Sequence, residues 1–217
     1  MPESGPVSFK PGQYLETVLP SGKKCPFSIA SAPNVQGVVE LHVRPTPNSS
    51  DSLEIEALLN DSVPLEVEMP KGDCYLERAP DNTLILLAAS TGITQMKSIV
   101  EHLLDDGFEH PVYLYWGVLS SSDLYLDDLC KKWDRENDNF HYIAVVSEPS
   151  SSPDWTGRTG LVGDAVLDDF DDLHDVTVIV SGGPAMVYAT LDAFMERGMP
   201  RQNMRSDIFS YAPRPNP

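Results

Sequence analysis

The sequence predicts two units in succession, an antiparallel β unit over residues 1–79 and a parallel-sheet α/β unit over residues 80–217. Two observations carry this prediction. Up to about residue 78 apolar and polar residues alternate, which is the period of half-buried strands. From about residue 81 continuous apolar runs alternate with helical patterns, as in a sheet covered on both faces. The boundary falls near Ala79 and Pro80, and we find no internal repeat.

The first unit is expected to consist of short strands separated by turns. Tyr14–Leu19 is one extended run, Leu41 and Val43 alternate with polar neighbours in a second, and Leu65–Met69 alternates in a third. Proline and glycine separate these runs, which favours an antiparallel barrel or sandwich. Apolar residues at helical spacing occur in this unit at Ser52–Leu59.

The second unit is expected to alternate strands and helices. The predicted strands are Thr83–Ala89, Val112–Trp116, His141–Val146, Val176–Ser181 and Asp207–Tyr211. The predicted helices are 93–104, Ser122–Trp133 with Ser122 or Asp123 as its cap, Leu161–Leu167, and Ala185–Arg197 before Gly198. This alternation predicts a parallel sheet with helices on both faces.

Composition excludes several classes of protein. A net charge of -18 repels phosphate backbones and anionic lipid, so neither nucleic acid nor a membrane is expected as a partner. No apolar run is long enough to cross a bilayer, and residues 1–6 do not resemble a signal peptide, so we expect a cytoplasmic protein. Cys25, Cys74 and Cys130 are too few and too scattered for a disulfide framework, and they give no sign of a metal.

Two strand-to-helix turns are candidate nucleotide sites. The first follows the strand at 83–89 and consists of Ser90, Thr91 and Gly92. The second follows the strand at 176–181 and consists of Gly182, Gly183 and Pro184. In open parallel sheets ligands bind beyond the carboxyl ends of the strands, where helix N-termini present free N–H groups. Each turn alone also fits a purely structural connection, and the absence of a complete G-x-G-x-x-G fingerprint disfavours a conventional Rossmann dehydrogenase.

Several short motifs resemble the ferredoxin–NADP reductase superfamily, and particularly its small bacterial NAD(P)H–flavin reductases of the luciferase-associated kind. Phe9–Tyr14 is similar to the F-x-x-G-Q-[YF] strand, and Pro26–Ser31 to the flavin-binding R-P-[YF]-S-[IM]-A-S segment. Leu87–Ile93 is similar to the A-G-G-T-G-[IF] turn. Further motifs follow in family order at Tyr115–Gly117, Trp155–Gly160 and Gly182–Met186. Their common order over nearly the whole chain is more specific than any one motif.

The resemblance implies a flavin-binding β-barrel of the FAD-binding reductase type over residues 1–79, followed by an NAD(P)-binding α/β domain over residues 80–217. It implies hydride transfer from NADH or NADPH to FMN or FAD, with electrons passing to a partner such as an oxygenase. The alternative is a degenerate reductase-like subunit that binds or regulates without turnover. NADH is favoured because no arginine follows Trp116 and Gly117, and because Asp123 would repel a 2′-phosphate.

The resemblance also implies which residues form the site. Ser28 is the candidate catalytic residue, because its hydroxyl would hydrogen-bond near flavin N5. The flavin-binding candidates are Pro26, Phe27, Ser28, Ile29, His42, Val43 and Arg44, and the dinucleotide-binding candidates are Ser90, Thr91, Gly92, Gly182, Gly183 and Pro184. Without the motif, Phe27 would be assigned to the barrel core and His42 to the solvated face of a strand.

Two departures from the family pattern concern the flavin half. The first strand of the six-stranded barrel is missing, so another segment closes the barrel, the edge stays open, a second subunit covers it in a homodimer, or the sequence starts inside the domain. The position of the flavin-phosphate arginine is occupied by Cys25, whose thiol cannot fork onto a phosphate. Lys23, Lys24 or Arg44 could compensate in part. We therefore expect a flavin that is weakly held or bound as a substrate.

Overall fold

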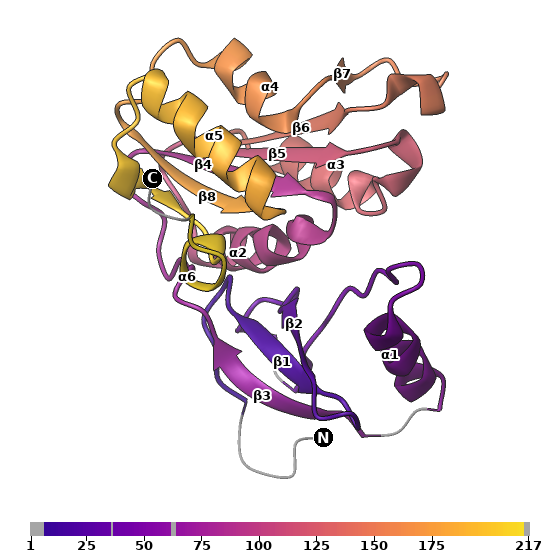
Figure 1. Ribbon diagram of the computed structural model, residues 1–217. Coiled ribbons are helices and arrows are strands. Elements are labelled where there is room, and N and C mark those ends of the chain that lie inside the picture. The colour runs from indigo at the N-terminus through magenta and orange to yellow at the C-terminus, as the bar shows by residue number, and fades with distance from the viewer. Residues whose placement is uncertain (1–6, 36, 62–63, 215–217) are drawn as a thin grey trace.

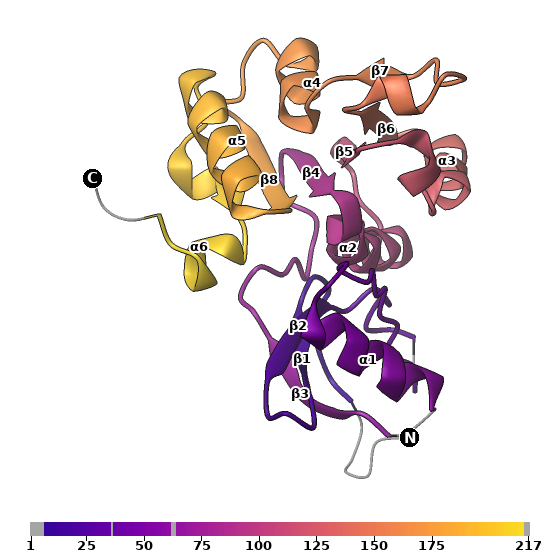
Figure 2. The same cartoon turned by 45° about the vertical axis from the view of Figure 1, so that its right-hand side comes forward.

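The computed structural model describes residues 7–35, 37–61 and 64–214. In these residues the chain forms two units, each with its own sheet (Figure 1). The smaller unit contains an antiparallel sheet in the order β2-β1-β3, made of β1 (Tyr14–Val18), β2 (Lys24–Ser28) and β3 (Glu66–Lys71). Helix α1 (Ser50–Asn60) lies beside this sheet (Figure 2). Ser49 is the N-cap of the helix, and its side chain accepts a hydrogen bond from the Ser52 N–H.

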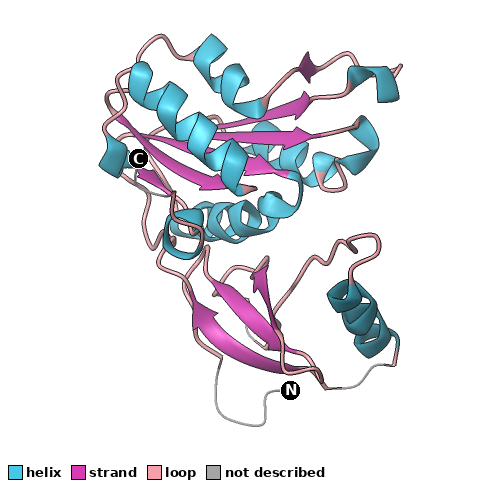
Figure 3. Ribbon diagram, in the orientation of Figure 1, coloured by secondary structure: helices cyan, strands magenta, loops and turns pink. Residues whose placement is uncertain are grey.

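The larger unit contains a parallel sheet in the order β7-β6-β5-β4-β8-β9 within the described residues. Its strands are β4 (Thr83–Ala89), β5 (Val112–Val118), β6 (Phe140–Val146), β7 (Arg158–Thr159), β8 (Val176–Ser181) and β9 (Met204–Arg205). Its α-helices are α2 (Ile93–Asp106), α3 (Asp127–Glu136), α4 (Val162–Asp169), α5 (Pro184–Glu196) and α6 (Ile208–Tyr211). Short 3₁₀ helices connect them at η1 (Ser90–Gly92), η2 (Ser121–Asp123), η3 (Pro149–Ser151) and η4 (Arg201–Asn203) (Figure 3).

The large sheet is covered on both faces, with α2 and α3 on one face and α4 and α5 on the other (Figure 1). Alternate residues of β4 therefore enter different cores. Leu84 and Leu86 pack with the residues of α2 and α3, whereas Ile85 and Leu87 pack with those of α4 and α5. Burial on both faces explains the uninterrupted apolar run in this strand and confirms the predicted parallel sheet.

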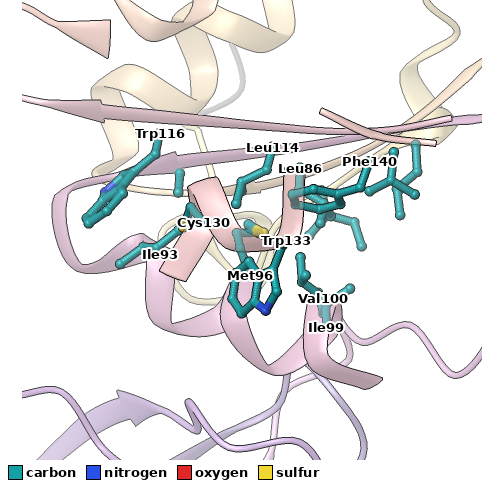
Figure 4. Close-up of a cluster of buried hydrophobic side chains, with 14 of the residues drawn as sticks. Leu86, Ile93, Met96, Ile99, Val100, Leu114, Trp116, Cys130, Trp133 and Phe140 are labelled. Atoms are coloured by element: carbon teal, nitrogen blue, oxygen red, sulfur yellow. The ribbon is translucent and has the colours of Figure 1, made fainter. Parts of the chain in front are cut away.

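Helix α2 is seated on the sheet by a dense apolar cluster (Figure 4). Met96 and Val100 from the helix pack in the same buried cluster as Leu86 from β4, and all three are at most 1% exposed. Trp133 from α3 and Phe140 from β6 extend the cluster with an edge-to-face contact at 6.1 Å. This packing fixes α2, whose first turn then lies at the carboxyl end of β4.

The smaller unit has a core of Phe9, Leu15 and Ile29, against which Leu41 packs. The strand expected around Leu41 and Val43 has no strand ladder in the structure, and a single backbone bond from the Ala30 N–H to the Glu40 carbonyl, 2.8 Å long, joins this segment to the end of β2. In the described residues β2 and β3 are the outer strands of the three-stranded antiparallel sheet, which agrees with the predicted antiparallel barrel unit that lacks a strand. A second subunit at the open edge stays a prediction.

The strand predicted at Asp207–Tyr211 is wrong. The sheet ends with β9, and the chain then turns into α6, where the Ala212 N–H donates to the Ile208 carbonyl at 2.9 Å. The run of apolar residues is too short to show a period of two or of 3.6. The turn begins where the Phe209 N–H donates to the Ser206 carbonyl at 3.2 Å, and the Ile208 N–H donates to the Ser206 hydroxyl at 3.4 Å.

The helix predicted at Ser122–Trp133 begins later, at Asp127. Ser120 and Asp123 form a reciprocal capping box around η2, which is a separate 3₁₀ turn. The predicted cap at Ser122 or Asp123 is wrong, because Ser120 is the N-cap of η2, Asp123 is its third residue, and Leu126 precedes α3 without a side-chain cap from the described residues. Among the described residues, no helix has both the length and the apolar character that a membrane span requires, and no three His, Cys, Asp or Glu side chains are grouped as metal ligands.

A polar seam joins the smaller unit to α2, which lies above the small sheet in both views (Figures 1 and 2). Gln95 is only 2% exposed, and its Nε2 donates to the Gly12 carbonyl at 2.8 Å, the Cys74 carbonyl at 3.0 Å and Asp207 Oδ2 at 3.1 Å. One helical turn away, Ser98 Oγ donates to the Ser31 carbonyl at 2.8 Å. Because these groups are buried and directional, they fix how the two units face each other.

Replacing Gln95 by leucine removes this donor and leaves the buried carbonyls of Gly12 and Cys74 without it. We expect the free energy of unfolding to fall by about 2 to 4 kcal/mol. The measurement is urea unfolding followed by circular dichroism, with Gln202→Leu on the exposed turn η4 as the matched control. Equal unfolding midpoints for the two variants would contradict the role of Gln95.

Candidate active site between the two units

A cavity of about 350 Å³ lies between the smaller and larger units and takes its wall from both. The residues that line it are Pro26, Phe27, Ser28, His42, Arg44, Ala89, Ser90, Thr91, Gly92, Thr94, Ser181, Gly182 and Gly183. The structure thus brings together most of the site residues predicted from the sequence. Residues 26–44 and 181–183 are far apart in the chain, so their meeting is a property of the fold.

Three predicted site residues lie outside this wall. Ile29 is fully buried in the small core, and its N–H already donates to the Gln13 carbonyl at 3.0 Å. This follows from the alternation of side chains, because the residue after Ser28 points to the opposite face. Val43 is half-buried but does not line the cavity, and Pro184 lies in the wall of a different, more open cavity on the outside of α5.

Ser28 lies where two cavities meet. A second cavity of about 260 Å³ shares Pro26, Ser28, Ser181 and Gly182 with the first. Its remaining wall includes Tyr14, Gln95, Ser206, Asp207 and Tyr211. The Ser28 hydroxyl therefore lies between a hydroxyl-rich turn on one side and the half-buried carboxyl group of Asp207 on the other.

The turn after β4 lines the cavity with Ser90, Thr91 and Gly92 of η1. Ser90 has a left-handed φ of 52°, an uncommon value for a residue with a side chain. It is held from two sides, because Trp116 Nε1 donates to its carbonyl at 2.9 Å and Arg44 Nη1 donates to its Oγ at 2.8 Å. No side chain caps η1 or the start of α2 within the described residues. The Ile93 N–H donates to the Ser90 and Thr91 carbonyls, so η1, and not the first residue of α2, is the helix start that favours an anion.

Gly92 keeps the two ligand-facing turns together. A Cβ at this position would lie 2.2 Å from the Ser181 carbonyl oxygen, so only glycine allows the start of α2 to approach the end of β8 this closely. Gly183, by contrast, has no atom within 4 Å of the position that a Cβ would occupy. The first glycine therefore serves packing, and the second leaves open space beside the cavity.

Arg44 is the one cation in the wall of the interdomain cavity, as far as the described residues show. Lys23 forms an ion pair with Asp51, and Lys24 forms one with Glu68, so both lysines are engaged within the smaller unit. Of the three cations that could compensate for Cys25, only Arg44 reaches the cavity. Cys25 itself is half-buried on β2, and burial raises the pKa of its thiol, so the thiol stays neutral and offers an anion no positive charge.

The expectation that Asp123 repels a dinucleotide phosphate is not supported by its contacts. Its Oδ2 accepts from the Ser120 N–H at 3.2 Å and from the Ser120 hydroxyl at 3.1 Å. Its Oδ1 lies 3.4 Å from Arg44 Nη2, so a cation already balances its charge. Asp123 is a cap and an interdomain contact, and it does not line the cavity.

The expectation that His42 is solvated is wrong, since its side chain is only 15% exposed. Its Nε2 lies 2.7 Å from Glu40 Oε1, and its Nδ1 lies 2.8 Å from the Tyr125 hydroxyl. Lys97 from α2 donates to Glu40 Oε2 at 2.8 Å. These bonds, together with that of Arg44 to Ser90, attach the segment 40–44 to the larger unit and so close one side of the cleft.

A third cavity, of about 430 Å³, lies at the carboxyl ends of β4, β5 and β6, between α4 and α5. It shares Ala89 and Ser90 with the interdomain cavity, so the two meet at the end of β4. Its wall is mainly apolar and includes Leu119, Leu161, Val162, Met186 and Phe194. Sequence analysis missed these residues, although the rule that ligands bind at strand ends points to Leu119 directly after β5.

Arg158, which the family motif contains, braces the loop before α4. Its Nη1 donates to the Ala165 carbonyl at 2.8 Å, and its guanidinium pairs with Asp169, which also accepts from the Tyr115 hydroxyl at 2.7 Å. Trp155 donates from Nε1 to the Arg158 carbonyl at 2.8 Å. Both residues therefore serve packing of the loop against the sheet.

Asp207 is a titratable group in the cleft that sequence analysis assigned to a strand. Burial raises its pKa from 3.8 to about 6, although hydrogen bonds from Cys74 and Gln95 act in the opposite direction. Between these two pH values the folded protein binds more protons than the unfolded chain does. Stability is therefore greatest below the ordinary pKa and falls as pH rises through the folded-state value.

We expect Asp207→Asn to abolish this loss of stability at higher pH, because the amide cannot ionise. Relative to the unsubstituted protein, the variant should gain about 2 kcal/mol in free energy of unfolding between pH 4 and pH 7. Urea unfolding at both pH values measures this, with Asp105→Asn on the exposed end of α2 as control. Parallel pH dependence in all three proteins would show that Asp207 ionises normally.

Comparison with known proteins places the chain in a family. The family model for the oxidoreductase NAD-binding domain matches residues 86–192. The chain is 32% identical to an NAD(P)H-flavin reductase of Vibrio harveyi over 216 residues, which cover 97% of this chain and 90% of the relative. It is 36% identical to protein RfbI of Salmonella typhimurium, but it spans 62% of the length of that relative.

Solved structures agree on the fold. The structure of the cytochrome P450 reductase GcoB of Amycolatopsis matches with a TM-score of 0.82 at 28% identity, over 94% of this chain and 62% of that one. Motif order, the paired sheets and the close relative of nearly equal length all lead to one assignment. The chain belongs to the NAD(P)H–flavin reductase family, within the ferredoxin reductase fold.

Proposed function

We propose that the chain transfers hydride from NADH or NADPH to a flavin, FMN or FAD. The observation that carries this proposal is the interdomain cavity, in which Ser28 and Arg44 of the smaller unit face the ligand-binding turns of the larger unit. The Vibrio harveyi relative, named as an NAD(P)H-flavin reductase, supports the same reaction. Because the reaction needs two ligands placed face to face, a cleft between two units suits it.

The residues in the cavity fit a flavin. Pro26 and Phe27 offer an apolar surface on β2, and Ser28 offers a hydroxyl beside it. Arg44 would hold the flavin phosphate. When bound, the flavin would supply the hydride acceptor at its N5, and Ser28 would donate a hydrogen bond there.

The larger unit fits a nicotinamide dinucleotide. The apolar cavity between α4 and α5 would take the adenosine, and it meets the interdomain cavity at Ala89 and Ser90. The open space at Gly183 would admit the nicotinamide end. Thr91 and Gly92 lie between the two and would contact the pyrophosphate. The chain would thus position the two ligands, with no acid or base required for the hydride step.

We also propose that the reduced flavin passes electrons to a further acceptor. Protein RfbI and the Amycolatopsis cytochrome P450 reductase are longer than this chain, which spans 62% of each. The Amycolatopsis protein is named as a cytochrome P450 reductase, which supports an acceptor on a partner protein, such as an oxygenase. A homodimer that covers the open edge of the small sheet remains part of the same proposal.

Replacing Ser28 by alanine should lower kcat about 10- to 100-fold, because a hydrogen bond to the hydride-accepting edge is lost. The assay follows NADH absorbance with added FMN or FAD, and Ser151→Ala, on the exposed turn η3, is the matched control. An unchanged kcat would remove Ser28 from the reaction. If the unsubstituted chain neither turns over nor binds either flavin, the non-enzymatic alternative is favoured.

A single guanidinium should hold the flavin phosphate weakly, so we expect the purified protein to lose its yellow colour on dialysis. Arg44→Gln should raise the Kd for FMN about tenfold and leave the Kd for riboflavin, which lacks the phosphate, unchanged. Fluorescence quenching of each flavin measures both values. Two results would contradict the assignment of Arg44. One is protein that stays yellow after dialysis, and the other is an Arg44→Gln variant whose Kd rises by the same factor for FMN and for riboflavin.

A further inference from the structure

The cavity between α4 and α5 has an unusual charge pattern for a site that would receive a nucleotide. In the described residues its wall contains no lysine, arginine or histidine. Its one charged side chain there is Asp164, which is exposed in the first turn of α4. Leu119, which follows β5, contributes an apolar side chain where a cation would otherwise reach a phosphate.

The cation nearest along the chain cannot supply the missing charge. Arg158 precedes the wall residue Gly160 by two positions, but its guanidinium is held by Asp169 and by the Ala165 carbonyl. Turning it toward the cavity would break these bonds and leave Asp169 without its cation. Arg44, on the other side of Ser90, is engaged at the interdomain cavity.

We propose that Asp164 makes the enzyme selective for NADH. This inference rests on the proposed function, and it assigns the adenosine ribose of the dinucleotide to the neighbourhood of α4. The carboxylate would accept a hydrogen bond from the free 2′-hydroxyl of NADH. In NADPH a phosphate with nearly two negative charges replaces that hydroxyl, and a carboxylate beside a mainly apolar wall repels it.

One feature of the same helix acts against this repulsion. Among the residues that the structure describes, no side chain caps the N-terminus of α4, and Val162 and Gly163 in its first turn line the cavity. A helix start carries about half a positive charge, whereas Asp164 carries a full negative one in the same turn. The carboxylate therefore outweighs the helix dipole, and the net field at the ribose disfavours a phosphate.

The test compares kcat/KM for NADH and NADPH in three proteins. The unsubstituted protein should favour NADH by at least about tenfold, and Asp164→Asn should reduce that ratio about tenfold, mainly by improving NADPH. Asp168→Asn makes the same change of charge one turn further along α4, outside the cavity wall, and should leave the ratio unchanged. Equal use of both dinucleotides, or equal shifts in the two variants, would overturn the role of Asp164.

A binding measurement separates this inference from the proposed reaction. Calorimetry with ADP-ribose and with 2′-phospho-ADP-ribose needs neither flavin nor turnover. We expect the unsubstituted protein to bind ADP-ribose more tightly, and Asp164→Asn to narrow the difference. If no flavin is reduced but ADP-ribose still binds more tightly and Asp164→Asn narrows the difference, the proposed reaction is contradicted and the role of Asp164 is supported. If flavin is reduced but the two ligands bind with equal affinity in every variant, the role of Asp164 is contradicted and the proposed reaction is supported.

Discussion

One buried amide holds together the segments on which the site depends. Gln95 donates to carbonyls of two separate segments of the smaller unit and to the carboxylate of Asp207 near the C-terminal helix. It lies on α2, which the apolar cluster of Figure 4 fixes to the sheet. The turn η1, which leads directly into the same helix, lines the interdomain cavity. Helix α2 therefore holds segments of both units next to this cavity.

The electrostatics of the cleft differ between its two halves. The cavity proposed for the flavin has one guanidinium, on Arg44, and the cavity proposed for the dinucleotide has one carboxylate, on Asp164, in a mainly apolar wall. A protein with a net charge of -18 repels anionic ligands at long range. Both ligands would then be held mainly by shape and by backbone N–H groups. Such a site suits a flavin that enters and leaves as a substrate.

Sequence analysis predicted the elements correctly where burial determines the local pattern of apolar residues. The bounds of β4 and β8 were predicted to the residue, because strands buried on both faces are uninterrupted apolar runs. Alternation also placed Leu41 inward and Arg44 outward, although the strand pairing was absent. It failed where the outcome depends on distant partners. Asp123 could not be seen to pair with Arg44, 79 residues away, and the short run in α6 has no readable period.

A crystal structure of the protein with oxidised FMN and NAD⁺ tests the central claim most directly. The account predicts the flavin ring in the cleft between the two units, with N5 within hydrogen-bond distance of Ser28 Oγ and the phosphate beside Arg44. It also predicts the adenosine between α4 and α5. A flavin bound elsewhere, or a dinucleotide that avoids the carboxyl ends of β4 and β5, would contradict the account.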